Sequence, residues 1–192
     1  MTPCMLAAIM PLGAHAMGKI KQPRPVKLIV SVFTGDIDLL ALARAALVEG
    51  FGEIDYESER LPFDHTDYYE AEFGPNLQRQ IFSFAELLPP DRLALVKCRT
   101  NQLEQRWVVD GRRQVNLDPG YVSLGKLVLA TTKDYTHRVY LGQGIYAEVT
   151  LHYRRGSFWS WEWTYPDYAS ERYLQIFDHI RDVYVAQLRQ GD

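Results

Sequence analysis

The densest run of potentially reactive side chains lies at residues 131–138. Its sequence, Thr-Thr-Lys-Asp-Tyr-Thr-His-Arg, combines hydrogen-bonding groups, two cations and a titratable imidazole in a connection between elements. Connections that carry so many reactive groups are often functional sites. Lys133 and Arg138 would attract a phosphate group, and Asp134 and His137 could exchange protons with a ligand. A solvated loop with capping Asp and Thr residues would have the same composition.

Two further polar clusters lie at residues 64–69, which begin with Asp64 and His65, and at residues 116–118. Glu148, on a predicted strand, adds a third carboxylate to those of Asp118 and Asp134. If these segments border one cleft, the residues predicted to be catalytic are Asp134, His137 and Glu148. The residues predicted to bind the ligand are Asp64, His65, Asp118, Lys126, Lys133 and Arg138. If the clusters are scattered over the fold, an interaction module is favoured instead.

Lys126 enters this set because Gly120–Lys126 has the G-x-x-x-x-G-K spacing of a phosphate-binding loop. Leu127, however, occupies the position of the Ser or Thr that would hold magnesium, and no Asn-Lys-x-Asp guanine-reading motif occurs. The alternative is a turn followed by a helix in which Gly125 allows close packing. The motif is therefore a weak indication of phosphate binding.

Several other catalytic motifs do not occur in the sequence. There is no His-Glu-x-x-His, no His-x-His and no Cys/His cluster, so no metal site is predicted. There is no Gly-x-Ser-x-Gly elbow of a serine hydrolase and no Gly-x-Gly-x-x-Gly after the first strand. The sequence therefore leaves open whether the protein is an enzyme and which cofactor, if any, it uses.

The hydrophobic pattern predicts an α+β fold, with a single mixed or antiparallel sheet and helices packed on it. Residues 27–33 form a continuous apolar run, typical of a buried strand. Asp36 is placed to cap a helix that ends near Gly50 and Gly52. Residues 53–63 alternate between apolar and acidic side chains, which predicts a strand with one solvated acidic face. Residues 77–84 fit a strand or a helix equally well.

The second half of the chain is predicted to contain a three-strand meander followed by a long helix. The elements expected before the meander are a helix from Pro89 to about residue 108, a short strand at 113–117, a turn at 118–120 and a brief helix at 123–131. The meander strands are expected at residues 137–141, 145–153 and 157–164. After residues 167–170, the final helix has the strongest helical period in the chain.

The two hairpins of the meander have registers that the apolar pattern predicts. The loop Gly142–Gly144 would place Arg138 opposite Glu148 and Tyr140 opposite Tyr146. For the second hairpin, a three-residue loop over residues 154–156, with Gly156 at positive φ, is favoured because it places Val149 opposite Trp161. A two-residue loop would place Val149 opposite Glu162, since a one-residue slip moves every side chain to the other face. The favoured register also places Glu148 opposite Glu162, where the pair could hold a metal or a proton or could simply be solvated.

Trp159, Trp161 and Trp163 alternate along the last meander strand. Such a row could form a stacking platform for bases or sugars. The opposite face of the strand is polar, however, which favours packing of the tryptophans against the helices.

Composition limits the class of protein. The 192 residues are 47% hydrophobic and 23% charged, which is typical of a globular chain. A net charge of −3 gives no strong nucleic-acid signal, and two cysteines cannot build a disulfide framework. No apolar stretch approaches the roughly 20 residues that cross a membrane, and we expect a cytoplasmic protein.

The N-terminal residues 1–16 end in Ala-His-Ala, which mimics a signal-peptide cleavage site, but no Lys or Arg precedes their apolar run. We therefore expect an unstructured leader before Met17 and a single α+β domain over residues 17–192.

Four segments resemble the bacterial family known as domain of unknown function 4416. These are residues 18–28 (GKIKQPRPVKL), 51–74 (FGEIDYESERLPFDHTDYYEAEFG), 115–154 (VNLDPGYVSLGKLVLATTKDYTHRVYLGQGIYAEVTLHYR) and 164–168 (TYPDY). The resemblance extends from Met17 to about Arg189. Some members of the family are labelled GTP-binding, a label that the Gly120–Lys126 segment would explain, but the family implies no catalytic residues.

Two functions therefore remain open. The protein could be a small enzyme or binder that acts on a phosphorylated or nucleotide-like ligand. It could instead be a non-catalytic module whose polar loops contact a protein or RNA partner. The oligomeric state is not predicted.

Overall fold

The computed structural model describes residues 19–63 and 70–191. The predicted leader at residues 1–16 and the cluster that begins with Asp64 and His65 lie outside these ranges, so both stay predictions, as does the extent of the domain. The strands are β1 (Val26–Thr34), β2 (Ile54–Glu57), β3 (Leu61–Pro62), β4 (Gln78–Leu88), β5 (Val108–Val109), β6 (Arg112–Arg113), β7 (Asn116–Val122), β8 (Lys126–Thr131), β9 (Arg138–Gly142), β10 (Ile145–Arg154) and β11 (Ser157–Ser160). The helices are α1 (Ile37–Phe51), α2 (Glu70–Phe73), η2 (Pro90–Arg92), α3 (Leu93–Glu104), η3 (Gln105–Trp107), α4 (Pro166–Ala169) and α5 (Glu171–Gly191).

A nine-stranded sheet organises the fold, with the order β11-β10-β8-β7-β1-β4-β2, to which β3 adds beside β4 and β9 beside β10. Its described strand pairings are all antiparallel. Strands β5 and β6 form a separate small hairpin. The predicted α+β class, antiparallel sheet and long C-terminal helix are confirmed.

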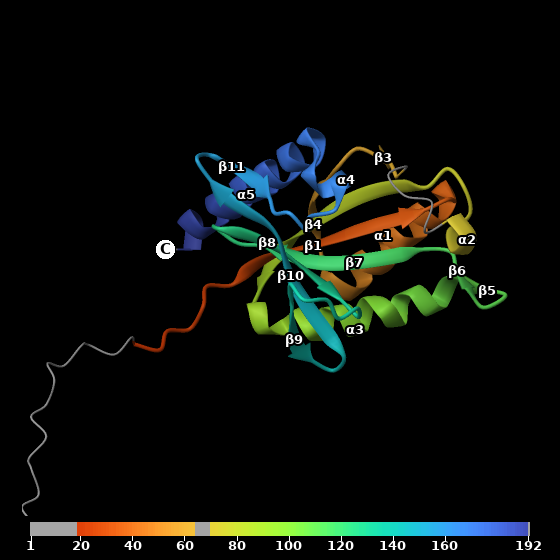
Figure 1. The fold of residues 1–192 in the computed structure, drawn as a ribbon, viewed down its shortest axis with the longest axis horizontal. Coiled ribbons are helices and arrows are strands. Elements are labelled where there is room, and N and C mark those ends of the chain that lie inside the picture. Colours follow the sequence, from red (N-terminus) through yellow and green to blue (C-terminus); the bar gives the residue numbers. More distant parts are fainter. Residues whose placement is uncertain (1–18, 64–69, 192) are drawn as a thin grey trace, which may run out of the picture.

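Helices cover both faces of the sheet (Figure 1). Val30 of β1 lies in one core with Leu47 of α1 and Val96 of α3. Ile29, the preceding residue of β1, lies in a second core with Phe177 of α5. Every residue of β1 is buried, as expected for a strand that is covered on both sides.

Several local predictions are confirmed. Asp36 caps α1 by accepting a hydrogen bond from the backbone N–H of Asp38 at 2.8 Å, and Gly52 at φ 89° ends the helix. The ambiguous residues 77–84 belong largely to strand β4. The expected solvated acidic face at residues 53–63 is only partly correct, because Asp55 pairs with the fully buried Lys27.

The predicted turn at residues 118–120 and the helix at 123–131 are wrong. Both segments are strands, β7 and β8, joined by a tight turn in which the Ser123 N–H donates to the Lys126 carbonyl oxygen at 2.9 Å. Leu127 packs toward α5 while Val128 packs toward α3, so the short apolar run is buried on both sides. A run of this kind has no period that separates a strand from a helix. Because Gly120–Lys126 is a β-hairpin, the phosphate-binding-loop interpretation is also wrong.

The first meander hairpin has the predicted register, with Arg138 opposite Glu148 and Tyr140 opposite Tyr146. The predicted three-residue loop is wrong, because Gly142 pairs with Ile145 and only Gln143 and Gly144, with φ values of 57° and 75°, form the turn; a shift in the pairing between Ile145 and Tyr146 restores the predicted register. Positive φ at both central residues is the geometry that best matches the twist of paired strands.

The register of the second hairpin is not the favoured one. Leu151 lies opposite Ser160, and Arg155 and Gly156 form a two-residue turn with φ values of 52° and 90°. Positive φ at Gly156 is thus confirmed. The three-residue loop is wrong because Arg155 adopts the left-handed conformation without being glycine. β11 ends at Ser160, so the described structure contains no pairing of Glu148 with Glu162, and no pocket is built on that pair.

The tryptophans do not pack under a helix. Trp159, Trp161 and Trp163 are 43%, 39% and 37% exposed and lie at the edge of the sheet. The Trp161 and Trp163 rings stack on each other with centroids 5.2 Å apart, and Trp163 stacks on His137 at 5.4 Å. The Trp163 indole N–H also donates to the Val149 carbonyl oxygen, on the part of β10 between its pairings with β9 and β11. Trp161 and Trp163 therefore form a surface stack, Trp159 is exposed on β11, and the prediction of helix packing is wrong.

Candidate functional site

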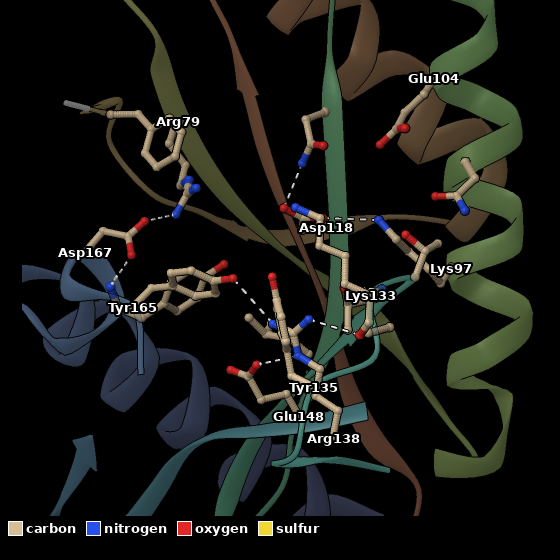
Figure 2. Close-up of a pocket in the computed structure, with 18 of the residues that line it drawn as sticks. Arg79, Lys97, Glu104, Asp118, Lys133, Tyr135, Arg138, Glu148, Tyr165 and Asp167 are labelled. Atoms are coloured by element: carbon tan, nitrogen blue, oxygen red, sulfur yellow. Dashed lines mark hydrogen bonds and ion pairs between the residues drawn. The ribbon is translucent and has the colours of Figure 1, made fainter. Parts of the chain in front are cut away.

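A pocket of about 680 Å³ opens where β7 and β8 separate (Figure 2). The two strands pair only from Gly120–Leu129 to Val122–Leu127. Pro119 precedes this pairing and has no N–H to donate to a ladder, so a strand pairing can end beside it. The gap is lined from β7 and β8, from α3 on one side, and from β4 and α4 on the other.

Two of the three polar clusters predicted from the sequence border this one pocket. Of the predicted site residues, Asp118, Lys133, Arg138 and Glu148 line it. Phe63, the last described residue before the third cluster, lines it too.

Asp64 and His65 are outside the described residues, and three predicted residues that the structure does describe do not line the pocket. Lys126 lies at the opposite end of β8 and pairs with His152, so it does not line the pocket. His137 does not line the pocket either, but its Nε2 atom lies 3.1 Å from Oε2 of Glu148, which does. Asp134 hydrogen-bonds Tyr146; burial and this carboxylate together raise the pKa of the Tyr146 hydroxyl.

A buried lysine and an aspartate form one wall of the pocket. Lys97 of α3 donates to the Leu117 carbonyl oxygen at 2.9 Å and to Asp118 Oδ1 at 3.1 Å. Asn116 Nδ2 donates to Asp118 Oδ2 at 2.7 Å. Burial alone would raise the pKa of Asp118, but the charges of Lys97 and Arg79, with these hydrogen bonds, lower it below its ordinary value. Asp118 is therefore an ionised acceptor that faces the cavity at neutral pH.

Glu104, the last residue of α3, is the second acid on this wall. Its carboxylate accepts from the Leu117 N–H at 2.7 Å and from Arg113 Nη1 at 3.2 Å. Burial, with a contribution from the charge of Asp118, raises its pKa. Two acids whose pKa values are shifted in opposite directions form a pair suited to holding and accepting protons.

The opposite wall contains a buried ion pair between Arg79 of β4 and Asp167 of α4. The Arg79 guanidinium also lies 4.0 Å from the centroid of the Phe63 ring and 5.4 Å from that of Tyr168. Burial raises the pKa of the Tyr168 hydroxyl and brings that of Tyr173 to about 12. Because Arg79 and Asp167 neutralise each other and the raised pKa keeps Tyr168 neutral, these three side chains together bring no net charge to this wall.

The mouth of the pocket is organised by Glu148 (Figure 2). This carboxylate accepts from Arg138 Nε at 2.9 Å and from Thr150 Oγ1 at 3.1 Å. Arg138 also donates to the Lys133 carbonyl oxygen at 3.0 Å, which fixes the course of the 131–138 connection, and its guanidinium lies 4.4 Å from the Tyr135 ring centroid.

Sequence reasoning missed Lys97, Glu104, Arg113 and Arg79. A signal was present in α3, because Lys97 and Glu104 follow Leu93 at helical spacings of four and eleven residues. A lysine and a glutamate on the apolar stripe of a helix must find partners when buried.

The lining as a whole contains five basic and four acidic side chains. These are Arg79, Lys97, Arg113, Lys133 and Arg138, and Glu104, Asp118, Glu148 and Asp167. Such a pocket offers donors for an anionic group and acceptors for hydroxyl or amino groups. In the part of the chain that the structure describes, no three His, Cys, Asp or Glu side chains are grouped to hold a metal ion. Nor does any described helix have the length and apolar character to span a membrane.

Comparison with known proteins places the chain in a family. Searches of curated proteins and of solved structures found no match. The family model described as domain of unknown function DUF4416 matches residues 24–184, which include every residue that lines the pocket. The chain therefore belongs to the DUF4416 family.

Proposed function

We propose that the protein binds a small phosphorylated or nucleotide-like ligand in the pocket between β7 and β8. The observation that carries this proposal is the convergence of Asp118, Lys133 and Arg138, from separate segments, on one cavity of about 680 Å³. Pockets that hold small ligands usually have volumes of about 300–1,000 Å³ and a few convergent polar groups.

The two ends of the pocket suit different parts of such a ligand. Lys133 and Arg138 at the mouth would donate charge-assisted hydrogen bonds to phosphate oxygens. Asp118, ionised in the interior, would accept from sugar hydroxyls or from an amino group. The rings of Tyr135 and Tyr165, which also line the mouth, could contact a planar group.

Chemistry on the bound ligand is a further part of the proposal, with Glu148 acting from the pocket wall and with Asp134 and His137, which do not line the pocket, as the other predicted catalytic residues. The contact between His137 and Glu148 at 3.1 Å supports it, because a carboxylate that orients an imidazole favours proton transfer. Incubation of bound phosphoesters with the protein, followed by ³¹P NMR, would detect turnover. Loss of turnover in His137→Gln, with binding retained, is the expected result.

Binding is tested with a panel of inorganic phosphate, sugar phosphates and nucleotides, with and without magnesium, in thermal-shift and calorimetric titrations. A ligand at 100 times its dissociation constant stabilises the fold by about 2.7 kcal/mol. Lys133→Gln should weaken binding at least about tenfold, since a hydrogen bond to a charged group contributes about 1.5–3 kcal/mol. Lys21→Gln, an exposed lysine that does not line the pocket, is the matched control.

Absence of any shift across the panel would contradict the proposal, as would equal weakening by the two lysine variants. Cell fractionation would test the predicted cytoplasmic location, where phosphorylated metabolites are available. The alternative of an interaction module is favoured by a separate observation, the exposed apolar residues along the β9–β11 edge of the sheet.

A further inference from the structure

Strand β9 forms an outer edge of the sheet. It pairs with β10, and no other described strand lies against it. The β9–β10 hairpin extends past α3 (Figure 1). As a result, Val139, Tyr140 and Leu141 are 68%, 59% and 42% exposed. An edge of this kind presents backbone hydrogen-bonding groups and apolar side chains together.

This edge also concentrates the exposed apolar surface of the protein. Fifteen large apolar residues are exposed in the described chain, and eight of them lie on or beside β9 and β11. These eight are Tyr135, Val139, Tyr140, Leu141, Trp159, Trp161, Trp163 and Tyr165. Single exposed apolar residues are ordinary, but a contiguous group rich in Trp and Tyr is typical of a protein interface.

β9 lacks the side chains that usually protect an edge strand. Natural edges carry lysine, proline or outward charges that discourage pairing with another strand. β9 has no lysine or proline, and its one charged residue, Arg138, is buried against Glu148; its one irregularity, the step over Leu141 in the pairing with β10, lies near its C-terminal end. An unprotected apolar edge is a template for strand addition.

We propose that β9 pairs antiparallel with β9 of a second copy of this chain, so that the two sheets join across a two-fold axis. The sequence of β9 is self-complementary in this arrangement. Centred on Tyr140, the pairing places Val139 opposite Leu141, so that apolar side chains meet. It places Arg138 opposite Gly142, which has no side chain, so no like charges face each other. A two-fold axis of this kind gives the closed dimer that is commonest among soluble proteins.

The dimer would bring two ligand sites close to one interface. Arg138 belongs to β9 and lines the pocket mouth, together with Tyr135 and Tyr165 of the same exposed group. The proposed pairing uses the edge of β9 that faces away from β10. The dimer proposal therefore does not depend on the ligand proposal.

The first test is sedimentation velocity of the full chain over a concentration range up to about 100 µM, in the micromolar range of weak specific complexes. The wild type should sediment as a dimer, and the double variant Val139→Lys/Leu141→Lys should sediment as a monomer that keeps the far-ultraviolet circular dichroism spectrum of the wild type. Val109→Lys, which changes a valine that is 56% exposed on the β5–β6 hairpin, should remain a dimer. A wild type that stays monomeric overturns the proposal, as does a double variant that stays dimeric. A monomer that binds another protein through β9 would likewise overturn it.

The second test checks the register. In a background with Cys4→Ser and Cys98→Ser, Tyr140→Cys should form an intermolecular disulfide under mild oxidation, because residue 140 faces its own copy. Leu141→Cys, which would face Val139, should crosslink at least about tenfold more slowly. Equal crosslinking of both variants would overturn the pairing.

Calorimetry of the Val139→Lys/Leu141→Lys variant with a pocket ligand keeps the two proposals separable, since ligand binding can persist in a monomer.

Discussion

Replacement of Glu148 by glutamine should destabilise the fold by about 3 kcal/mol, because it leaves the Arg138 guanidinium buried without an ionic partner. The two side chains are each 3% exposed, with Arg138 Nε 2.9 Å from Glu148 Oε2. Removal of one partner of a buried ion pair costs about 3–5 kcal/mol. We expect the lower end of this range, because the glutamine oxygen can still accept from Thr150.

The assay is urea denaturation followed by circular dichroism, with a thermal melt beside it. For a chain of this size, 3 kcal/mol corresponds to a decrease in Tm of about 6–12 °C. Glu162→Gln, at an exposed position, is the control and should change stability by less than about 0.5 kcal/mol. Arg138→Met combined with Glu148→Gln should recover most of the loss, because it removes both buried charges. If Glu148→Gln and Glu162→Gln unfold at the same urea concentration, the reasoning about the buried pair is refuted.

Three further substitutions test other parts of the structure. Gly120→Ala should cost about 1–3 kcal/mol in urea denaturation, because the added methyl would lie 2.4 Å from the Val128 carbonyl oxygen, whereas Gly125→Ala, with open space around it, should be neutral. Asp118→Asn should flatten the acid side of the stability–pH profile. The pKa of Asp118 is lowered from 3.8, so its ionised form stabilises the fold at neutral pH, and this contribution is lost as the pH falls below 3.8 toward the folded-state value; parallel profiles for variant and wild type would contradict this. Arg155→Asn should stabilise the protein by about 0.5 kcal/mol in scanning calorimetry, because asparagine tolerates the observed φ of 52° better than arginine, and a lower Tm would show that the turn is not strained.

The elements that the sequence predicts correctly are those with a long or local signal. Helix α5 has apolar residues at helical spacing over 21 residues, and α1 has Asp36 as a cap. The β9–β10 hairpin has a local turn signal around Gln143, and the predicted register holds because a shift in the pairing between Ile145 and Tyr146 offsets the shorter turn. The β7–β8 hairpin was missed because Pro119 and Gly120, which are common in turns, lie here inside a strand. Gly120 is required there by the close approach of β8, a contact that no local pattern reveals.

The residues of the candidate site also differ in whether a local sequence pattern predicts them. Lys133 and Arg138 could be predicted, because polar side chains crowd one short connection. The spacing in α3 marks Lys97 as buried, but its place at the pocket, like that of Arg79, could not be predicted, because it is set by the order of strands in the sheet. Their charges act on Asp118 across long sequence separations, and the lowered pKa of that residue is a property of the assembled fold.

The stacking of Trp163 on His137 places an intrinsic fluorophore beside the pocket wall. The indole ring lies 5.4 Å from the imidazole, and the imidazole contacts Glu148 on the pocket wall at 3.1 Å. Indole emission is sensitive to the groups stacked on the ring, so the emission intensity of Trp163 depends on the position of His137. A ligand that displaces Glu148 would therefore move His137 and change the fluorescence of Trp163. Of the four tryptophans, Trp107 lies away from this stack beside the core, so Trp159→Phe and Trp161→Phe variants would isolate the emission of Trp163 against a nearly constant background.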